Sequence, residues 1–338
     1  MGKAAAARKL AAAAAFGGGG LSLLGASLYG VLITEALLAR RVIGNAEGVP
    51  PDATGWYGAD RPGPTLKLAL LGDSSAAGYG VEAVRDTPGA RLASGLATWT
   101  DHRVYLQSVA RVGAQTRDLD GQIDAALVIE PTAVVILIGV NDITHRRRPS
   151  ESVRLLGVAT RRLREEGVEV IVGTCPDLGT IEPIAPPLKQ VARAWSRRLA
   201  AAQTIATVEA GGRSVSLGSI LGPEFEALPN VLFGPDQFHP SATGYASLAQ
   251  ALLPSVLAAV GVVLPGEEGP EPARGEAVLP IAQAAVNAAR VPGTEVDGTH
   301  ARETEHGSRG RLAQLRLRRR RPEAETQSPS EAPATPDE

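Results

Sequence analysis

The stretch Val134–Asp142, with the sequence VVILIGVND, decides the fold class of this 338-residue chain. Its first five residues are all aliphatic, which is typical of a strand buried on both faces of a sheet. The polar pair Asn141 and Asp142 follows after only two residues. Strands buried on both faces belong to parallel sheets covered by helices, and ligands bind just beyond the carboxyl ends of such strands.

Four further strands of this kind are predicted on either side of that stretch. They cover Leu66–Leu71, Val104–Val109, Val168–Val172 and, more weakly, Ser214–Leu217. The segments between them carry apolar residues at helical spacing, most clearly from Tyr245 to Leu257. Alternating short strands and helices predict an α/β fold, a three-layer α/β/α sandwich with a central parallel sheet of about five strands.

Residues with catalytic chemistry follow these strands or precede the last helix. Ser74 follows the first strand, Gly113 the second and Asn141 the third, while Asp236 and His239 stand just before the last helix. A serine hydroxyl becomes a good nucleophile when a histidine removes its proton and a carboxylate orients that histidine. The oxyanion then formed needs hydrogen-bond donors, for which the backbone N–H groups of Ser74 and Gly113 and the Asn141 amide are candidates.

These four segments, in this order, resemble the conserved blocks of the SGNH/GDSL hydrolase family. The match consists of Gly-Asp-Ser, a glycine, Gly-Val-Asn-Asp and Asp-x-x-His, and it covers about Leu66 to Val260. Ser75 stands where the family name has Leu, at a variable position. The resemblance implies the flavodoxin-like SGNH hydrolase fold, in agreement with the strand pattern.

The resemblance also implies a role for each matched residue. By it, Ser74 is the nucleophile, His239 the general base and Asp236 the group that orients the base. The oxyanion hole is implied to consist of Ser74, Gly113 and Asn141. Each residue also has a structural alternative, such as a turn serine, a turn glycine or a helix-capping asparagine.

The implied activity is that of a serine esterase, a lipase-like enzyme that hydrolyses carboxylic esters, with a preference for short acyl chains. The substrate is expected to be a small-molecule ester or an ester of a lipid or polysaccharide, and no cofactor or metal is expected. Two alternatives stay open: an O-acyltransferase that uses the same site, and a non-catalytic, membrane-tethered binding module. An α/β-hydrolase is disfavoured because Gly-x-Ser-x-Gly is absent, and a nucleotide-binding fold because Gly78 and Gly80 lack a third glycine.

Composition excludes other classes of function. The net charge is only -2 and aromatic residues make up 4%, which gives no reason to expect a nucleic-acid partner. The single cysteine, Cys175, excludes an intrachain disulfide, and no cluster of His, Cys, Asp and Glu has the spacing of a metal site.

The N-terminal segment 1–42 is predicted to be a membrane anchor or a signal segment. No charged residue occurs between Leu10 and Thr34, a run longer than the roughly 20 residues that cross a bilayer. Lys3, Arg8 and Lys9 precede this run and favour a cytoplasmic N-terminus, with the catalytic domain outside the cell membrane. The alternatives are a cleaved signal, which would make the protein secreted, and a buried or disordered Ala-rich helix.

The remaining boundaries follow from shifts in composition. Residues 43–64, rich in Pro and Gly, are predicted to be a linker, and residues 65–264 to be the SGNH hydrolase domain. Residues 265–338, rich in Pro, Glu and Arg, are predicted to be a largely disordered tail with one possible short helix at Val278–Ala289.

Overall fold

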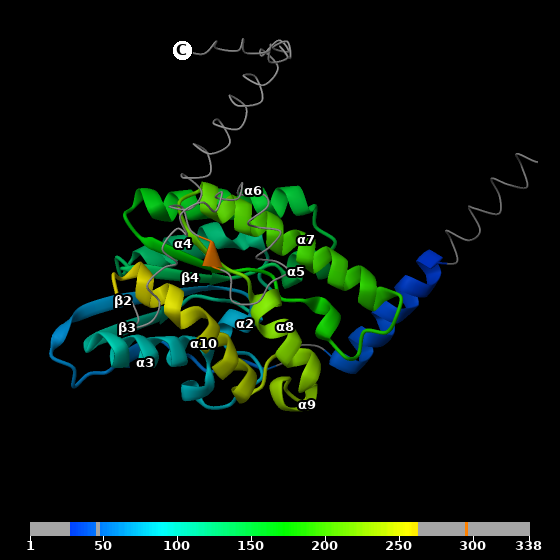
Figure 1. Cartoon of the computed structure of the whole chain (residues 1–338), viewed down its shortest axis with the longest axis horizontal. Coiled ribbons are helices and arrows are strands. Elements are labelled where there is room, and N and C mark those ends of the chain that lie inside the picture. The colour runs from blue at the N-terminus through cyan, green and yellow to red at the C-terminus, as the bar shows by residue number, and fades with distance from the viewer. Residues whose placement is uncertain (1–27, 45–47, 263–294, 297–338) are drawn as a thin grey trace, which may run out of the picture.

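Within residues 28–44, 48–262 and 295–296, which the computed structural model describes, a seven-stranded sheet runs in the order β1-β3-β2-β4-β5-β6-β7 (Figure 1). Five consecutive strands of this order are parallel. They are β2 (Gly63–Gly72), β3 (His102–Ser108), β4 (Ala133–Leu137), β5 (Glu169–Gly173) and β6 (Arg213–Val215). The predicted fold class is therefore confirmed. Because β2 lies between β3 and β4, the chain leaves its carboxyl end at the point where the strand order reverses, which is where open α/β sheets bind ligands.

Two short antiparallel strands extend this sheet at its edges. Strand β1 (Gly55–Tyr57) pairs with β3, and β7 (Glu295–Val296) pairs with β6. The sequence predicts a linker over residues 43–64, whereas the structure places β1 inside this range. The Trp56 and Tyr105 rings lie 5.1 Å apart across the two paired strands, a cross-strand contact that holds β1 in the sheet.

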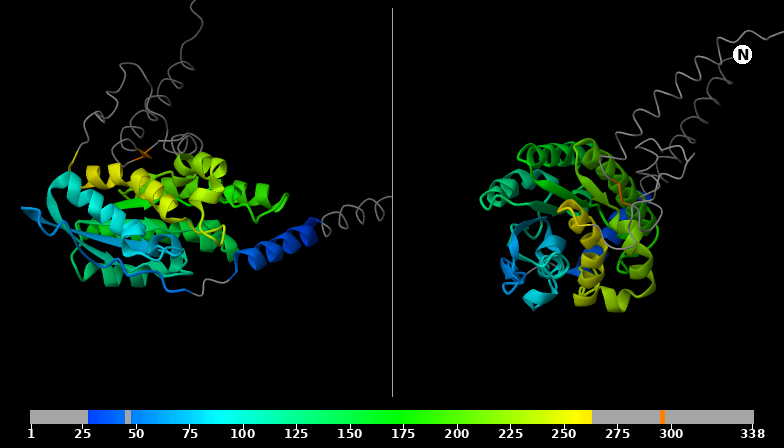
Figure 2. Two further views of the ribbon diagram at one scale, coloured as in Figure 1. Left: turned by 90° about the horizontal axis from the view of Figure 1, so that it is seen from below. Right: turned by 60° about the vertical axis from the view of Figure 1, so that its left-hand side comes forward.

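Helices cover both faces of the sheet (Figures 1 and 2). Side chains alternate along β2, so that Leu68 and Leu70 face one layer while Ala69 and Leu71 face the other. The first layer contains α3 (Pro88–Thr100), α8 (Leu217–Ala227) and α10 (Ala242–Ala259). The second contains α4 (Leu119–Leu127), α6 (Pro149–Glu165) and α7 (Leu188–Glu209). Short helices α2 (Ser74–Ala77), α5 (Val140–Thr144) and α9 (Pro229–Leu232) lie in the connections.

Ser241 caps the N-terminus of helix α10. The Ser241 hydroxyl accepts a hydrogen bond from the Gly244 N–H at 3.1 Å, as expected of an N-cap residue. Tyr245, Leu252 and Val256 of the helix are fully buried in the core. The loop that carries Asp236 and His239 is thereby anchored at its C-terminal end.

A helix at residues 28–43 docks on the domain (Figure 1), and near its start the Tyr29 hydroxyl accepts a hydrogen bond from Arg146 at 3.5 Å. The Glu35 carboxylate accepts a hydrogen bond at 2.8 Å from the N–H of Leu188, the first residue of α7. Arg40 donates to the Thr144 carbonyl at 3.2 Å, and Ile43 packs into a cluster of buried apolar residues. The large apolar side chains that this helix exposes are Leu28, Tyr29, Val31, Leu37, Leu38 and Val42.

No helix in the described part of the chain combines the length and apolar character that crossing a bilayer requires. Most of the segment predicted to be an anchor or signal, residues 1–27, lies outside the described residues, as does the helix predicted at Val278–Ala289.

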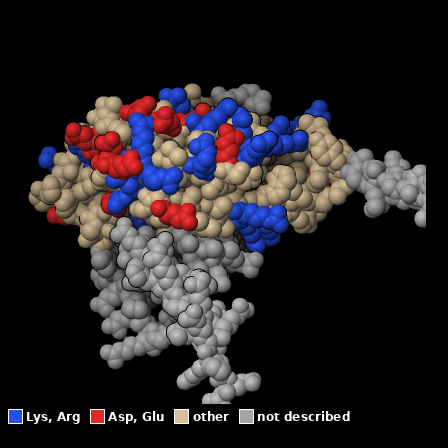
Figure 3. Space-filling view, turned by 90° about the horizontal axis from the view of Figure 1, so that it is seen from above, with Lys and Arg blue, Asp and Glu red and all other residues tan. Residues whose placement is uncertain are grey.

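Basic and acidic side chains are interspersed on the face that carries α6 and α7 (Figure 3). Arg162 of α6, for example, forms ion pairs with Asp120 at 2.6 Å and Asp124 at 2.5 Å, both on α4. Arg162 is therefore balanced by carboxylates of the neighbouring helix on the part of this face that the structure describes.

Candidate active site

The backbone at the end of β2 sets the position of Ser74. Gly72 has φ of 138°, and a Cβ atom there would collide with the Leu137 carbonyl oxygen of β4. Only glycine therefore fits where the two strands approach. The Asp73 carboxylate accepts a hydrogen bond from the Ser75 N–H at 3.0 Å and caps α2, so that Ser74 is the first residue of this short helix. Asp73 therefore has a structural role in this turn.

A tight loop brings Asp236 and His239 to Ser74. One oxygen of Asp236, Oδ1, accepts hydrogen bonds from the N–H groups of Phe238 and His239, each at 3.0 Å. The other oxygen, Oδ2, lies 2.6 Å from His239 Nδ1. His239 Nε2 lies 2.9 Å from Ser74 Oγ. The three side chains that the sequence predicts to act together therefore form one continuous hydrogen-bonded chain.

The pKa values of two carboxyl groups, one in this hydrogen-bonded chain and one beside it, are shifted in opposite directions. Burial raises the pKa of Asp236, but the hydrogen bonds from the His239 ring and from the backbone N–H groups of Phe238 and His239 outweigh burial and leave it below its usual value. Burial likewise raises the pKa of Asp73, here to about 7, although the Ser75 N–H and nearby His239 favour its charged form. The lowered pKa keeps Asp236 charged beside the imidazole, whereas Asp73 changes its protonation state near pH 7.

Aromatic rings fix the plane of the His239 imidazole. The Tyr79 ring centroid lies 4.5 Å from that of His239, and the Phe238 ring lies 4.9 Å away on an edge. The Tyr79 carbonyl accepts a hydrogen bond from the buried Tyr245 hydroxyl at 2.7 Å, which ties the loop of Tyr79 to α10. Sequence reasoning did not single out Tyr79, because its position between two glycines resembles an ordinary loop.

Asn141 and Gly113 lie on the two connections that flank β2. Gly113 is exposed and has φ of 81°, a conformation that glycine adopts readily. The Asn141 side-chain amide donates a hydrogen bond to the Ala114 carbonyl at 3.0 Å, so the two predicted residues are linked through the residue next to Gly113. The backbone N–H of Arg111 donates to the Gly72 carbonyl at 3.0 Å and holds this connection against the end of β2.

Two buried glutamines hold the strand ends in place, and sequence reasoning did not find them. Gln122 of α4 accepts from the Gly72 N–H at 2.7 Å and donates to the Gly72 carbonyl at 3.0 Å. Gln203 of α7 accepts from the Cys175 N–H at 2.8 Å and donates to the Ile138 carbonyl at 2.9 Å. Both side chains satisfy backbone groups that have left the sheet ladder, and so they fix the connections that carry the site.

Asp142, next to Asn141, joins three segments beneath the surface. Its buried carboxylate accepts hydrogen bonds from the N–H and the hydroxyl of Thr116, at 3.1 and 2.8 Å, and from the Ser152 hydroxyl at 2.7 Å.

The described residues contain no group of three or more His, Cys, Asp and Glu side chains that could hold a metal ion.

A serine, a histidine and an aspartate joined in this order, at the carboxyl edge of a parallel sheet, define the class of serine hydrolases by geometry. Residues 70–247 match the model of the GDSL-like Lipase/Acylhydrolase family. The chain is also 42% identical over 245 residues to the GDSL-like esterase Rv1075c of Mycobacterium tuberculosis, covering 69% of this chain and 77% of that protein. This chain therefore belongs to the GDSL-like lipase/acylhydrolase family, as the sequence motifs indicated, and it is a carboxylic ester hydrolase.

Solved structures of similar fold include two hydrolases of low sequence identity. A catalytic mutant of an acetylxylan esterase from Geobacillus stearothermophilus is 18% identical with a TM-score of 0.48, and the match covers 61% of this chain and 99% of that one. A lipase/acylhydrolase from Enterococcus faecalis is 21% identical with a TM-score of 0.44, covering 56% and 95% of the two chains.

Proposed function

We propose that this protein hydrolyses short-chain carboxylic esters through an acyl-enzyme on Ser74, with His239 as general base and Asp236 as the residue that orients it. The observation that carries this proposal is the hydrogen-bonded chain from Ser74 Oγ through His239 to Asp236, with contacts of 2.9 and 2.6 Å. Because Asp236 Oδ2 accepts from Nδ1–H, the lone pair of His239 is placed on Nε2, opposite the serine hydroxyl.

In the first half of the reaction, Nε2 takes the Ser74 proton while Oγ forms a bond to the ester carbonyl carbon. The carbonyl π electrons move to oxygen, and Asp236 stabilises the imidazolium that results. When the oxyanion collapses, the bond to the alcohol oxygen breaks and that oxygen receives the proton from Nε2. The products are a free alcohol and an acyl group esterified to Ser74.

The oxyanion in this scheme is stabilised by the Ser74 N–H, the Gly113 N–H and the Asn141 side chain. An amide nitrogen has two N–H bonds, and one of those on Asn141 is engaged by the Ala114 carbonyl. That contact leaves the second N–H of Asn141 for the oxyanion, and it fixes the direction of that N–H bond. Preorganised donors of this kind contribute about 10²- to 10³-fold each to kcat in serine hydrolases.

In the second half, water replaces the alcohol. His239 Nε2 removes a proton from water, the hydroxide attacks the acyl carbon, and the proton returns to Ser74 Oγ as the carboxylic acid leaves. Transfer to a second alcohol instead of water would follow the same steps, and so the nature of the acceptor has to be measured.

Hydrolysis of p-nitrophenyl acetate and butyrate by the full chain tests the proposal, beside Ser74→Ala. We expect turnover that Ser74→Ala abolishes and an alkylphosphonate inhibitor that becomes attached to Ser74, as mass spectrometry would detect. Turnover that persists in Ser74→Ala would contradict the proposed nucleophile. Formation of a new ester rather than free acid, in the presence of a millimolar alcohol acceptor, would identify an acyltransferase instead.

We also propose that residues 1–42 hold the enzyme at the cell membrane with the catalytic domain outside. Support comes from the uncharged run between Leu10 and Thr34 and from the apolar side chains exposed on helix 28–43. The full chain should then sediment with membranes, resist extraction by high salt, and be digested by protease added outside intact cells. Recovery in the soluble fraction with its N-terminus intact would contradict this proposal.

A further inference from the structure

A cavity opens beside Ser74, between the carboxyl end of the sheet and helix α8. Its volume is about 90 Å³. Its wall is mostly hydrocarbon and includes Leu137 at the end of β4, Leu217, Leu221 and Phe225 of α8, and Phe233. A cavity that is largely apolar and adjoins a nucleophile suits a hydrocarbon group attached to the reacting carbonyl carbon.

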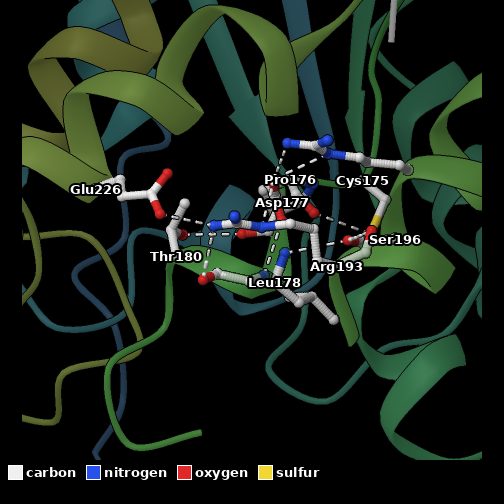
Figure 4. Close-up of polar contacts among 10 residues, drawn as sticks. Cys175, Pro176, Asp177, Leu178, Thr180, Arg193, Ser196 and Glu226 are labelled. Carbon is white, nitrogen blue, oxygen red and sulfur yellow. Dashed lines mark hydrogen bonds and ion pairs between the residues drawn. The ribbon is translucent and has the colours of Figure 1, made fainter. Parts of the chain in front are cut away.

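Two acidic residues, Asp73 and Asp177, border the cavity, and the Asp177 carboxylate is paired with arginines that do not line it. Figure 4 shows the Asp177 carboxylate among polar partners from α7. Asp177 Oδ2 accepts two hydrogen bonds from the Arg197 guanidinium, at 2.9 and 3.1 Å, and lies 3.4 Å from Arg193 Nε. Its other oxygen accepts from the Gly179 N–H at 2.8 Å. The charge of Asp177 is therefore balanced by Arg193 and Arg197, neither of which borders the cavity.

Arg193 links the elements that form this wall. Its guanidinium donates to the Gly179 carbonyl and to Glu226 of α8, each at 3.0 Å (Figure 4). The segment after β5 and helix α8 are thus joined to α7 by one side chain. A wall that is fixed before the substrate arrives loses little conformational entropy on binding, and its shape can select among substrates.

We propose that this cavity binds the acyl group of the substrate and admits chains of up to about four carbons. This inference rests on the proposed function of Ser74. An apolar cavity of about 150 Å³ in a protein core holds benzene, with its six carbons. By that comparison the cavity beside Ser74, at about 90 Å³, holds the three carbons beyond the carbonyl of a butyryl group.

The order of the two half-reactions favours the acyl group over the alcohol as the occupant of the cavity. The alcohol must take a proton from His239 and leave before water can enter, which requires a path to solvent. The acyl group stays attached to Ser74 through both halves of the reaction, and so its site beside the nucleophile needs no separate path to solvent until the acid is released. Each methylene buried there should raise kcat/KM about fourfold until the cavity is full.

Gly222 of α8 leaves room that determines the length of this chain. A Cβ built on Gly222 meets a single neighbour within 4 Å, the Asp177 Cβ at 3.7 Å, which is an ordinary contact. Both residues border the cavity, so a valine at this position would add two methyl groups at the cavity wall. Gly121 of α4 provides a matched control, because nothing lies within 4 Å of its Cβ position and it does not border the cavity.

The test measures kcat/KM of the full chain for p-nitrophenyl esters of two, four, six and eight carbons. For the wild type we expect a maximum at butyrate. Gly222→Val should lower the ratio of butyrate to acetate kcat/KM by about sixteenfold, because two methyl groups replace two carbons of the chain, each worth about fourfold. Gly121→Val should leave the ratio and the absolute rates unchanged.

A second series, acetate esters of lengthening alkyl alcohols, checks which half of the ester occupies the cavity. Gly222→Val should leave the rank order of this series as in the wild type. An unchanged butyrate-to-acetate ratio in a folded Gly222→Val protein, or an altered alcohol series, would overturn the inference while leaving the proposed function intact. Failure of the wild type to hydrolyse any of these esters would overturn both.

Thr174 provides an independent probe of the same wall. Its side chain borders the cavity, is 1% exposed, and carries a hydroxyl without a hydrogen-bond partner. Thr174→Val replaces that hydroxyl with a methyl group of similar shape. If hydrocarbon occupies the cavity, the butyrate-to-acetate ratio should rise about fourfold, whereas a fall would show that a polar group of the ligand binds Thr174.

Discussion

Ser74 Oγ and His239 Nε2 lie 2.9 Å apart, although 165 positions separate the two residues in the chain. The contact exists because β2 carries Ser74 to the centre of the sheet edge and α10 anchors the loop of His239 beside it. The strand that carries Ser74 and the loop that carries His239 must therefore both be placed correctly for the contact to form. Substitutions of the side chains around the contact test this arrangement.

Asp236→Asn should lower kcat by about 10⁴-fold with a folded protein and a similar KM. An asparagine retains the shape, but it cannot stabilise the imidazolium and favours the wrong tautomer of His239. Steady-state kinetics with p-nitrophenyl butyrate, beside a melting curve, would measure this. A loss below tenfold would show that Asp236 does not act on the histidine.

Tyr79→Leu should lower kcat about tenfold by releasing the His239 ring, whose centroid lies 4.5 Å from that of Tyr79. Tyr79→Phe keeps the ring and is the matched control, for which we expect nearly wild-type kcat. Equal losses in the two variants would assign the effect to the Tyr79 hydroxyl rather than to the stacked ring.

Gln122→Leu should lower the free energy of unfolding by roughly 2–4 kcal/mol, because it strips two hydrogen bonds from the buried backbone of Gly72. It should also lower kcat, since Ser74 is two residues away. Urea unfolding would measure the first effect. Gln107→Leu is a useful comparison, because the Gln107 Oε1 is buried without a hydrogen-bond partner, and its removal should cost far less.

Asp73→Asn should change how stability depends on pH. The folded-state pKa of Asp73, about 7, lies above its ordinary value of 3.8, so its contribution is fully present below about pH 4 and is lost as pH rises through 7. The wild type can lose up to about 4 kcal/mol of stability in this way, and Asp73→Asn, which does not titrate, loses none of it. Urea unfolding at pH 5 and pH 8 should therefore show Asp73→Asn gaining stability relative to wild type as pH rises. Parallel behaviour of the two proteins would contradict the raised pKa.

Glu35→Ala should loosen the helix at residues 28–43, because it removes the carboxylate that caps the first N–H of α7. We expect faster amide hydrogen exchange in that helix and a loss of about 1 kcal/mol in stability. Glu35→Gln keeps an oxygen that can accept the Leu188 N–H and should show a smaller effect. Unchanged exchange in Glu35→Ala would mean that apolar packing alone docks the helix.

Much of the fold was predictable because the hydrophobic pattern is unusually clear. The aliphatic run at Val134–Ile138 and its four counterparts predict the five parallel strands and place Ser74 and Asn141 beyond the ends of two of them. Strand β1 was missed, because prolines at 50, 51, 62 and 64 resemble a linker and the Trp56–Tyr105 contact is visible only in three dimensions.

The supporting residues of the site were not predictable for a related reason. A glutamine on a helix usually faces solvent, and nothing in the neighbourhood of Gln122 indicates that it bonds Gly72, 50 positions away. The cap that Glu35 supplies to Leu188 spans 153 positions. Local patterns predict elements and turn residues, whereas such contacts depend on the finished packing.

The docked helix has a mechanical consequence. A helix of residues 28–43 is about 24 Å long at 1.5 Å per residue, and contacts from Tyr29 to Ile43 fix it to the domain next to α5, which carries Asn141. The helix therefore forms one rigid unit with the domain. A surface that binds the N-terminal end of this helix would therefore also fix the orientation of the active site. That orientation would determine which esters the active site can reach.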